Sequence, residues 1–147
     1  MLSEMKMDYH EKLENGIKIV PMKPEHVEQL ESLQHKVFPN LAEEEILHAD
    51  QYKLHLEIFP EGQFVALDKE KVAGATTTMR YHYDIENPEP HTFSEIMGGG
   101  WLTTHDPNGE WLYGIDVSVD PSYRKMGIAK ALYRARQNLC RELQGGK

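Results

Sequence analysis

The residues best suited to chemistry by type and spacing lie at the end of an apolar stretch, Trp111 to Val119. Its odd-numbered residues are all apolar, and a period of two predicts a strand with these side chains on one core-facing side. Asp116 and Ser118 then lie on the opposite side of the strand. The pattern therefore predicts a strand that presents a carboxylate and a hydroxyl away from its apolar face.

The segment that follows has the composition of an anion site. The chain turns at Asp120-Pro121-Ser122, passes through the basic pair Arg124 and Lys125, and enters a helix at Gly127 to Ala129. The N–H groups at a helix start have no partner within the helix, and the helix dipole favours a negative ligand there. Gly127 also allows the backbone to approach a ligand closely. On these grounds the loop is a predicted diphosphate site.

The order of the residues in this segment is more specific than their composition. From Val117 to Ala129 it reads V-S-V-D-P-S-Y-R-K-M-G-I-A, which resembles the strand-loop-helix motif of the GNAT superfamily of N-acetyltransferases, with its core R/Q-x-x-G-x-G/A. The resemblance covers Gly16 to Leu143 and is specific between Leu112 and Ala135. It implies acetyl-CoA as cosubstrate and, as acceptor, a primary amine of a small molecule or a protein.

The resemblance implies a role for each motif residue. The N–H of Val117 would polarise the thioester carbonyl, as in an oxyanion hole. The strand residues Val117, Ser118 and Val119 would pair with the pantetheine arm as if it were another strand. The loop would bind the coenzyme A diphosphate through the backbone N–H groups of Arg124, Lys125, Met126, Gly127, Ile128 and Ala129.

Attack of a neutral amine on the thioester needs a base to take up the proton of the ammonium and an acid for the leaving thiolate. Asp116 is the candidate base, because it leaves the apolar face of the strand beside the expected thioester. A purely structural hydrogen bond or surface ion pair is an equally weighted interpretation of this residue. Glu110 and His105, just upstream, are weaker candidates, and the acid is not identified.

The other elements are expected to position this segment within one domain, residues 16–147, after a polar tail, residues 1–15. The fold class is α/β (α+β), a mixed and mostly antiparallel GNAT-like sheet flanked by helices. The expected strands are Gly16–Met22, Gly62–Asp68, Lys71–Tyr81 and Trp111–Asp120. The expected helices are Pro24–Val37, Glu43–Phe59 and Ile128–Leu143, and Asn87–Gly109 is a predicted loop.

Members of the GNAT superfamily continue with further strands after the motif helix, and this chain is expected to lack that C-terminal part. It would then be a fragment, a short form completed by a partner subunit, or a degenerate domain. The alternative function is accordingly a non-catalytic module for coenzyme A binding or assembly. A homo-oligomer, or completion by the missing segment, would supply the absent wall of the site.

The composition of the chain argues against several kinds of partner and site. The net charge of −8 over 147 residues argues against nucleic acid as a partner. No apolar run approaches the roughly 18 residues of a membrane helix, and the single Cys140 fits a reducing cytoplasm. The eight histidines show no metal-ligand spacing, so no metal is expected.

Overall fold

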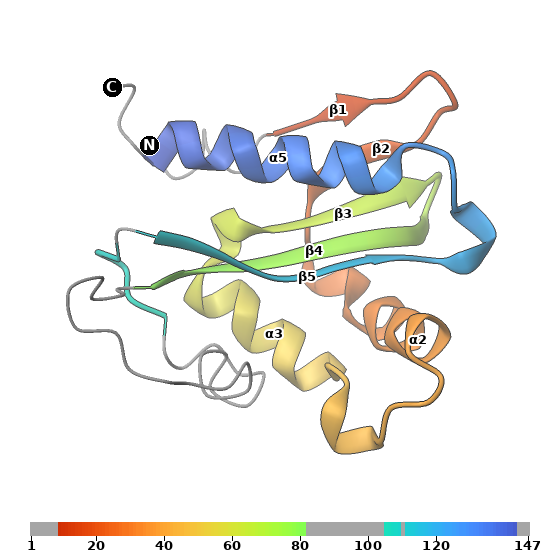
Figure 1. Cartoon of the computed structure of the whole chain (residues 1–147), viewed down its shortest axis with the longest axis horizontal. Helices are drawn as coiled ribbons and strands as arrows, with labels where there is room; N and C mark the ends of the chain where they lie inside the picture. The colour runs from red at the N-terminus through yellow and green to blue at the C-terminus, as the bar shows by residue number, and fades with distance from the viewer. Residues whose placement is uncertain (1–8, 82–104, 110, 144–147) are drawn as a thin grey trace.

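One antiparallel sheet with helices on both faces forms the fold (Figure 1). The computed structural model describes residues 9–81, 105–109 and 111–143. The sheet has the strand order β1 (Glu11–Lys12), β2 (Lys18–Pro21), β3 (Gln63–Asp68), β4 (Lys71–Tyr81) and β5 (Trp111–Val119). The α-helices are α2 (Val27–Val37), α3 (Ala49–Ile58) and α5 (Ile128–Leu143). The predicted fold class is confirmed.

The sheet separates two apolar layers. Helix α5 covers one face, while α2 and α3 cover the other (Figure 1). On the α5 side, Ile128, Leu132 and Leu139 pack on Ile19 and Phe64 of the sheet. Helix α5 begins and ends at the predicted residues, because its apolar positions recur at helical spacing. Among the described helices, none is long and apolar enough to cross a membrane.

The predicted second helix, Glu43–Phe59, is wrong at its start. Only a 3-10 turn, η2 (Glu43–Glu45), forms there, and α3 begins at Ala49. The reason is a tertiary contact, because side chains of α2 accept hydrogen bonds from the backbone between η2 and α3. Leu47 N donates to Gln34 Oε1 at 3.0 Å, and Ala49 N donates to Glu31 Oε1 at 2.9 Å. These side-chain acceptors satisfy N–H groups that a longer helix would have paired internally.

The described part of the predicted polar tail contains a strand. In β1, Glu11 pairs with Ile19 of β2, and the Arg134 guanidinium on α5 donates to the Glu11 carboxylate at 2.6 Å. Gly16, with φ of 89°, closes the turn between the two strands. Two polar residues have no readable alternation, so only their partners specify this strand. Residues 9–15 therefore belong to the folded domain.

Strand β5 contains a bulge that the predicted alternation missed. Asp116 pairs with Thr77 of β4, but the next pair is Gly114 with Thr78, which leaves Ile115 as an extra residue. The bulge exchanges the two faces of the strand. Gly114 and Val117 therefore both face the α5 side, and the single apolar face predicted from Trp111 to Val119 is wrong. The prediction holds after the bulge, where Asp116 and Ser118 face α2.

Candidate functional site

The turn after β5 is fixed by the carboxylate of Asp120. Asp120 Oδ1 accepts from Ser122 N at 2.9 Å, and Oδ2 lies 3.4 Å from Lys36 Nζ on α2. Burial alone would raise the pKa of Asp120, but the Ser122 hydrogen bond and the Lys36 ammonium outweigh it and lower the pKa. A charged Asp120 thus caps the short helix η4 (Pro121–Tyr123) and directs the chain back toward α5.

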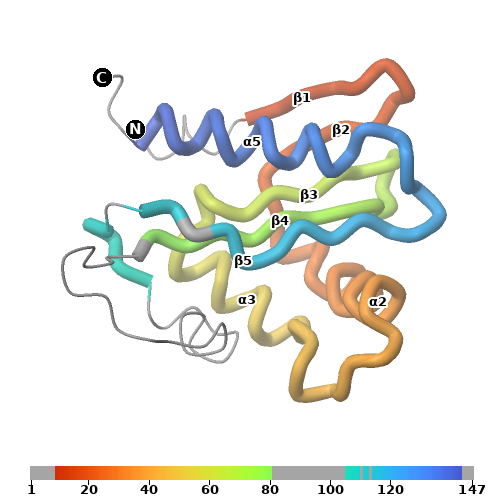
Figure 2. The backbone as a smooth tube through the Cα atoms, viewed as in Figure 1, coloured from red at the N-terminus to blue at the C-terminus, as the bar shows by residue number. Residues whose placement is uncertain are grey.

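Tyr123 attaches the same turn to the neighbouring hairpin. Its hydroxyl donates to Asp68 Oδ2 at 2.7 Å, and Lys71 Nζ lies 5.2 Å above the centre of its ring. Asp68 ends β3 and Lys71 begins β4. The turn is therefore held from two sides before the motif loop begins. Figure 2 shows the path of the backbone along β5, around this turn and back as α5.

The motif loop contains two left-handed backbone positions just before α5. Lys125 and Gly127 both have left-handed φ values, 65° and 80°. The first intrahelical hydrogen bond runs from Ala131 N to Gly127 O at 3.1 Å, so the N–H groups of Ile128 and Ala129 precede it. A left-handed lysine costs roughly 1–2 kcal/mol relative to glycine, and such strain is concentrated at functional sites. The turn and the start of the helix lie at the predicted residues.

A hollow of about 350 Å³ lies beside this loop. It is lined by Val119, Tyr123 and the loop, and three of its lining side chains are cationic while none is acidic: Arg124, Lys125 and Lys130. A Cβ atom added to Gly127 would meet nothing within 4 Å, so the space above this glycine is open. An anionic group has both room and positive potential here.

Gly74 on β4 allows α5 to begin directly against the sheet. A Cβ atom at this position would lie 2.9 Å from Ser118 O and 3.0 Å from Ile128 Cγ2. Ser118 O is backbone, and Ile128 is fully buried at the helix start. The close approach of β4, β5 and α5 therefore requires glycine at this point.

We expect Gly74→Val to destabilise the protein by about 1–3 kcal/mol, because the added methyl groups force β5 and α5 apart in a close-packed region. Urea unfolding followed by circular dichroism would measure the change, and Gly74→Ala should give a smaller loss. An unchanged unfolding midpoint for Gly74→Val would contradict the packing described.

Asp116 lies half-buried in a polar cluster beneath α2. Ser118 Oγ lies 2.8 Å from both carboxylate oxygens, and Gln34 Nε2 donates to Oδ2 at 3.1 Å. The orientation of the Gln34 amide is fixed because its oxygen accepts from Leu47 N. Burial raises the pKa of Asp116 above its ordinary value, although the hydrogen bonds from Ser118 and Gln34 oppose this shift.

Two further hydroxyl groups are buried near this carboxylate. Thr77 is the cross-strand partner of Asp116 and so faces the same side of the sheet. Tyr52 on α3 is 1% exposed, and its pKa is well above its ordinary value because of burial and then the nearby Asp116 charge. In the described part of the chain, the Thr77 hydroxyl has no hydrogen-bond partner, and the Tyr52 hydroxyl has only the Gln34 side chain nearby, without good hydrogen-bond geometry. Such polar interiors are costly and are expected at functional sites.

His105, one of the two weaker base candidates, is not part of this cluster. His105 lies beside Arg80 at the far end of β4, where its Nδ1 accepts from Arg80 N at 3.0 Å and its ring stacks on Phe59. Burial and the Arg80 charge lower its pKa. Glu110 lies outside the described residues, as does most of the predicted loop Asn87–Gly109.

Sequence reasoning missed Gln34 and Tyr52 as neighbours of Asp116. Gln34 follows Leu30 by four residues, which places it on the apolar face of α2. Tyr52 is on the buried face of α3 together with Gln51 and His55. The available signal was a polar residue at a helix position that otherwise faces the core. This signal is clearer for Gln34 than for Tyr52.

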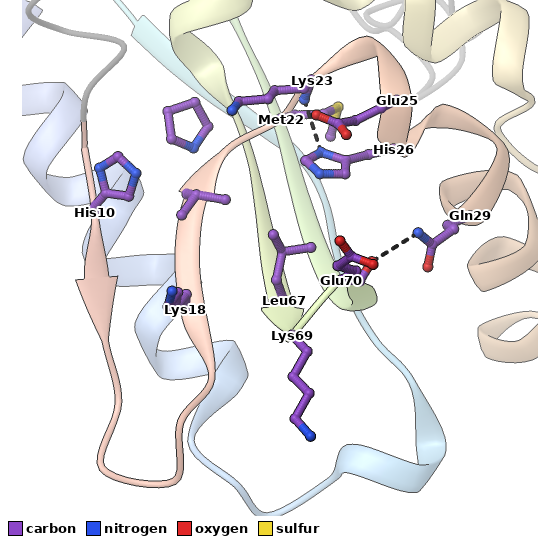
Figure 3. Close-up of a pocket in the computed structure, with 12 residues that line it drawn as sticks. His10, Lys18, Met22, Lys23, Glu25, His26, Gln29, Leu67, Lys69 and Glu70 are labelled. Atoms are coloured by element: carbon purple, nitrogen blue, oxygen red, sulfur yellow. Dashed lines mark hydrogen bonds between the residues drawn. The ribbon is translucent and has the colours of Figure 1, made fainter.

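A larger hollow, of about 740 Å³, lies away from the motif (Figure 3). Side chains of both signs line it, including Lys18, Lys23, Glu25 and Glu70. His26 also lines this hollow, and its Nδ1 accepts a hydrogen bond from Lys23 N at 3.0 Å. None of its lining residues belongs to the motif, so its size does not make it the diphosphate site.

Two curated proteins of Bacillus subtilis (strain 168) are similar in sequence to this chain. Uncharacterized N-acetyltransferase YkwB is 37% identical over 107 residues, which are 72% of this chain and 47% of that protein. Probable hydrolase YhcX is 37% identical over 117 residues, 80% of this chain and 22% of that protein. The chain thus spans less than half the length of either relative.

Solved structures share the fold at low sequence identity. The loading GNATL domain of CurA from Lyngbya majuscula superposes with a TM-score of 0.68 at 17% identity, over 84% of this chain and 58% of that one. The GphF GNAT-like decarboxylase in complex with isobutyryl-CoA gives 0.61 at 20% identity, over 79% and 55%. The family model described as Acetyltransferase (GNAT) family matches residues 27–147, most of the chain and all of its motif. The chain belongs to the GNAT acetyltransferase family.

Proposed function

We propose that this chain binds acetyl-CoA and transfers the acetyl group to a primary amine of a small molecule or a protein. The observation that carries the proposal is the motif loop, where two left-handed residues open a cationic hollow at the start of α5. The loop would hold the diphosphate through its backbone N–H groups. The structure of a fold neighbour with isobutyryl-CoA supports a coenzyme A ligand for this fold.

The pantetheine arm would then lie along β5. In the sheet formed by the described strands, β5 is the last strand, so one of its edges pairs with β4 and the other is available to a ligand. The Val117 N–H would polarise the thioester carbonyl and stabilise the oxyanion of the tetrahedral intermediate. Val117 and Val119 pack toward α5, while the side chain of Ser118 holds Asp116.

Asp116 would serve as the base for the incoming amine. The amine nitrogen forms a bond to the thioester carbonyl carbon, its proton passes to the Asp116 carboxylate, and the C–S bond breaks to release the thiolate of coenzyme A, which then takes up a proton. A raised pKa supports this role, because a base works best when its pKa approaches the working pH.

A non-catalytic coenzyme A-binding or assembly module is the second candidate. It is favoured by the surroundings of Asp116, whose two oxygens already accept hydrogen bonds inside the protein. A carboxylate held in this way can be purely structural. The open edge of β5 would then serve contact with a second chain instead of catalysis.

Isothermal titration calorimetry with acetyl-CoA, coenzyme A and ATP tests the binding step. We expect the two coenzyme A ligands to bind at least about tenfold more tightly than ATP, which has phosphates but no pantetheine arm. Equal affinities would overturn the proposal. Thiol release with a panel of primary amines then separates the two candidates, because a binding module releases no coenzyme A.

A further inference from the structure

The turn between β1 and β2 makes a direct contact with the motif loop across 111 positions of sequence. Asn15 Nδ2 donates to Met126 O at 3.0 Å. The side chain of Asn15 is itself oriented, because its Oδ1 accepts from Ile17 N at 3.1 Å. One amide group thus connects the turn to the loop, with each of its two ends engaged.

This hydrogen bond engages the peptide group between Met126 and Gly127, which sets the direction of the Gly127 N–H. Met126 lies between the two left-handed residues Lys125 and Gly127. Its carbonyl and the N–H of Gly127 belong to one trans peptide plane, in which C=O and N–H point in opposite directions. A carbonyl held toward Asn15 therefore turns the Gly127 N–H away from the β1–β2 turn.

The turn between β1 and β2 has hydrogen bonds and packing contacts of its own. Leu13 N donates to Ile17 O at 2.8 Å and Gly16 N donates to Leu13 O at 3.0 Å, which closes it. Glu11 is bound by Arg134 on α5, and Leu13 and Met126 pack on the same apolar cluster. The hairpin therefore has contacts with the helix, the core and the loop, and Asn15 is the point where it reaches the motif backbone.

We propose that Asn15 is a positioning residue of the diphosphate site: it fixes the Met126 carbonyl and so presents the Gly127 N–H to the ligand. This inference rests on the proposed function, since it assumes that the loop binds a diphosphate. Asn15 acts through the loop backbone and does not need to touch the ligand. It belongs to the segment expected as a polar tail, which the structure places beside the motif.

The test compares acetyl-CoA with acetyl-pantetheine, which lacks the diphosphate, in NMR titrations that follow backbone amide signals of the whole chain. We expect Asn15→Ala to weaken acetyl-CoA binding about tenfold and to reduce the ligand-induced shift of the Gly127 amide. The affinity for acetyl-pantetheine should stay unchanged. Asn15→Asp keeps an acceptor for Ile17 N but has no donor for Met126, so it should weaken acetyl-CoA binding at least as much.

Asn108→Ala, at an exposed turn position outside the motif, is the matched control and should change neither affinity. Equal losses for both ligands in Asn15→Ala would show a general structural role and overturn the inference. So would an unchanged acetyl-CoA affinity in Asn15→Ala. Failure of the wild-type chain to bind acetyl-CoA would instead refute the proposed function, so the two failures are distinguishable.

Discussion

Gly127→Glu is expected to raise the dissociation constant for acetyl-CoA by at least about 100-fold while the chain remains folded. Two effects add in this variant. A non-glycine residue at φ of 80° costs roughly 1–2 kcal/mol in backbone strain. The new side chain also enters the open space beside the cationic hollow, where its carboxylate repels a diphosphate.

A short series at this position separates strain from charge. Gly127→Ala introduces the strain with little bulk, and Gly127→Gln adds the size of glutamate without its charge. We expect the affinity for acetyl-CoA to fall in the order Ala, Gln, Glu, with similar small decreases in melting temperature. Calorimetry measures the affinities and circular dichroism the melting curves. Wild-type affinity in the glutamate variant would remove the loop as the diphosphate site.

The loop was predictable because its rules are local. A strand, a turn with proline, a left-handed glycine and a helix start are specified within the segment from Val117 to Ala129, and α5 follows its own apolar period. The same holds for β4, whose bounds match the prediction. These elements carry their signal in neighbouring residues, and distant contacts do not alter them.

The errors occur where distant contacts decide the structure. The start of α3 depends on acceptors from Gln34 and Glu31 on another helix, and β1 depends on pairing with β2 and on Arg134. The bulge at Ile115 is an exception with a local signal, because a glycine inside a strand, here Gly114, often marks one. Partners that are remote in sequence cannot be identified from the pattern of one chain.

Asp116→Asn is expected to lower kcat for acetyl transfer by about 10²–10⁴-fold, the usual contribution of a general base. Asparagine has nearly the same shape and can still accept from Gln34 Nε2 and pair with Ser118, so the fold should be retained. Steady-state kinetics under saturating acetyl-CoA measure the effect. Full activity in this variant would leave Asp116 with a structural role alone.

The pH dependence gives an independent check on the same residue. Because burial raises the folded pKa of Asp116, the folded protein binds the proton more tightly than the unfolded chain does. The contribution of this group to stability is therefore highest at low pH and falls as pH rises from the unfolded pKa through the folded pKa. Asp116→Asn lacks this loss, so its unfolding free energy relative to wild type should increase between pH 3 and pH 7.

Activity should depend on pH in the opposite direction, because only the ionised carboxylate can accept the proton of the amine. The acid limb of the pH–rate profile should then follow the pKa of Asp116. Ser118→Ala removes a hydrogen bond that lowers this pKa, so it should move the acid limb to higher pH. The acid limb could instead stay in place in Ser118→Ala while stability still responds to Asp116→Asn as predicted. That result would assign the Asp116 carboxylate to folding and the base to another group.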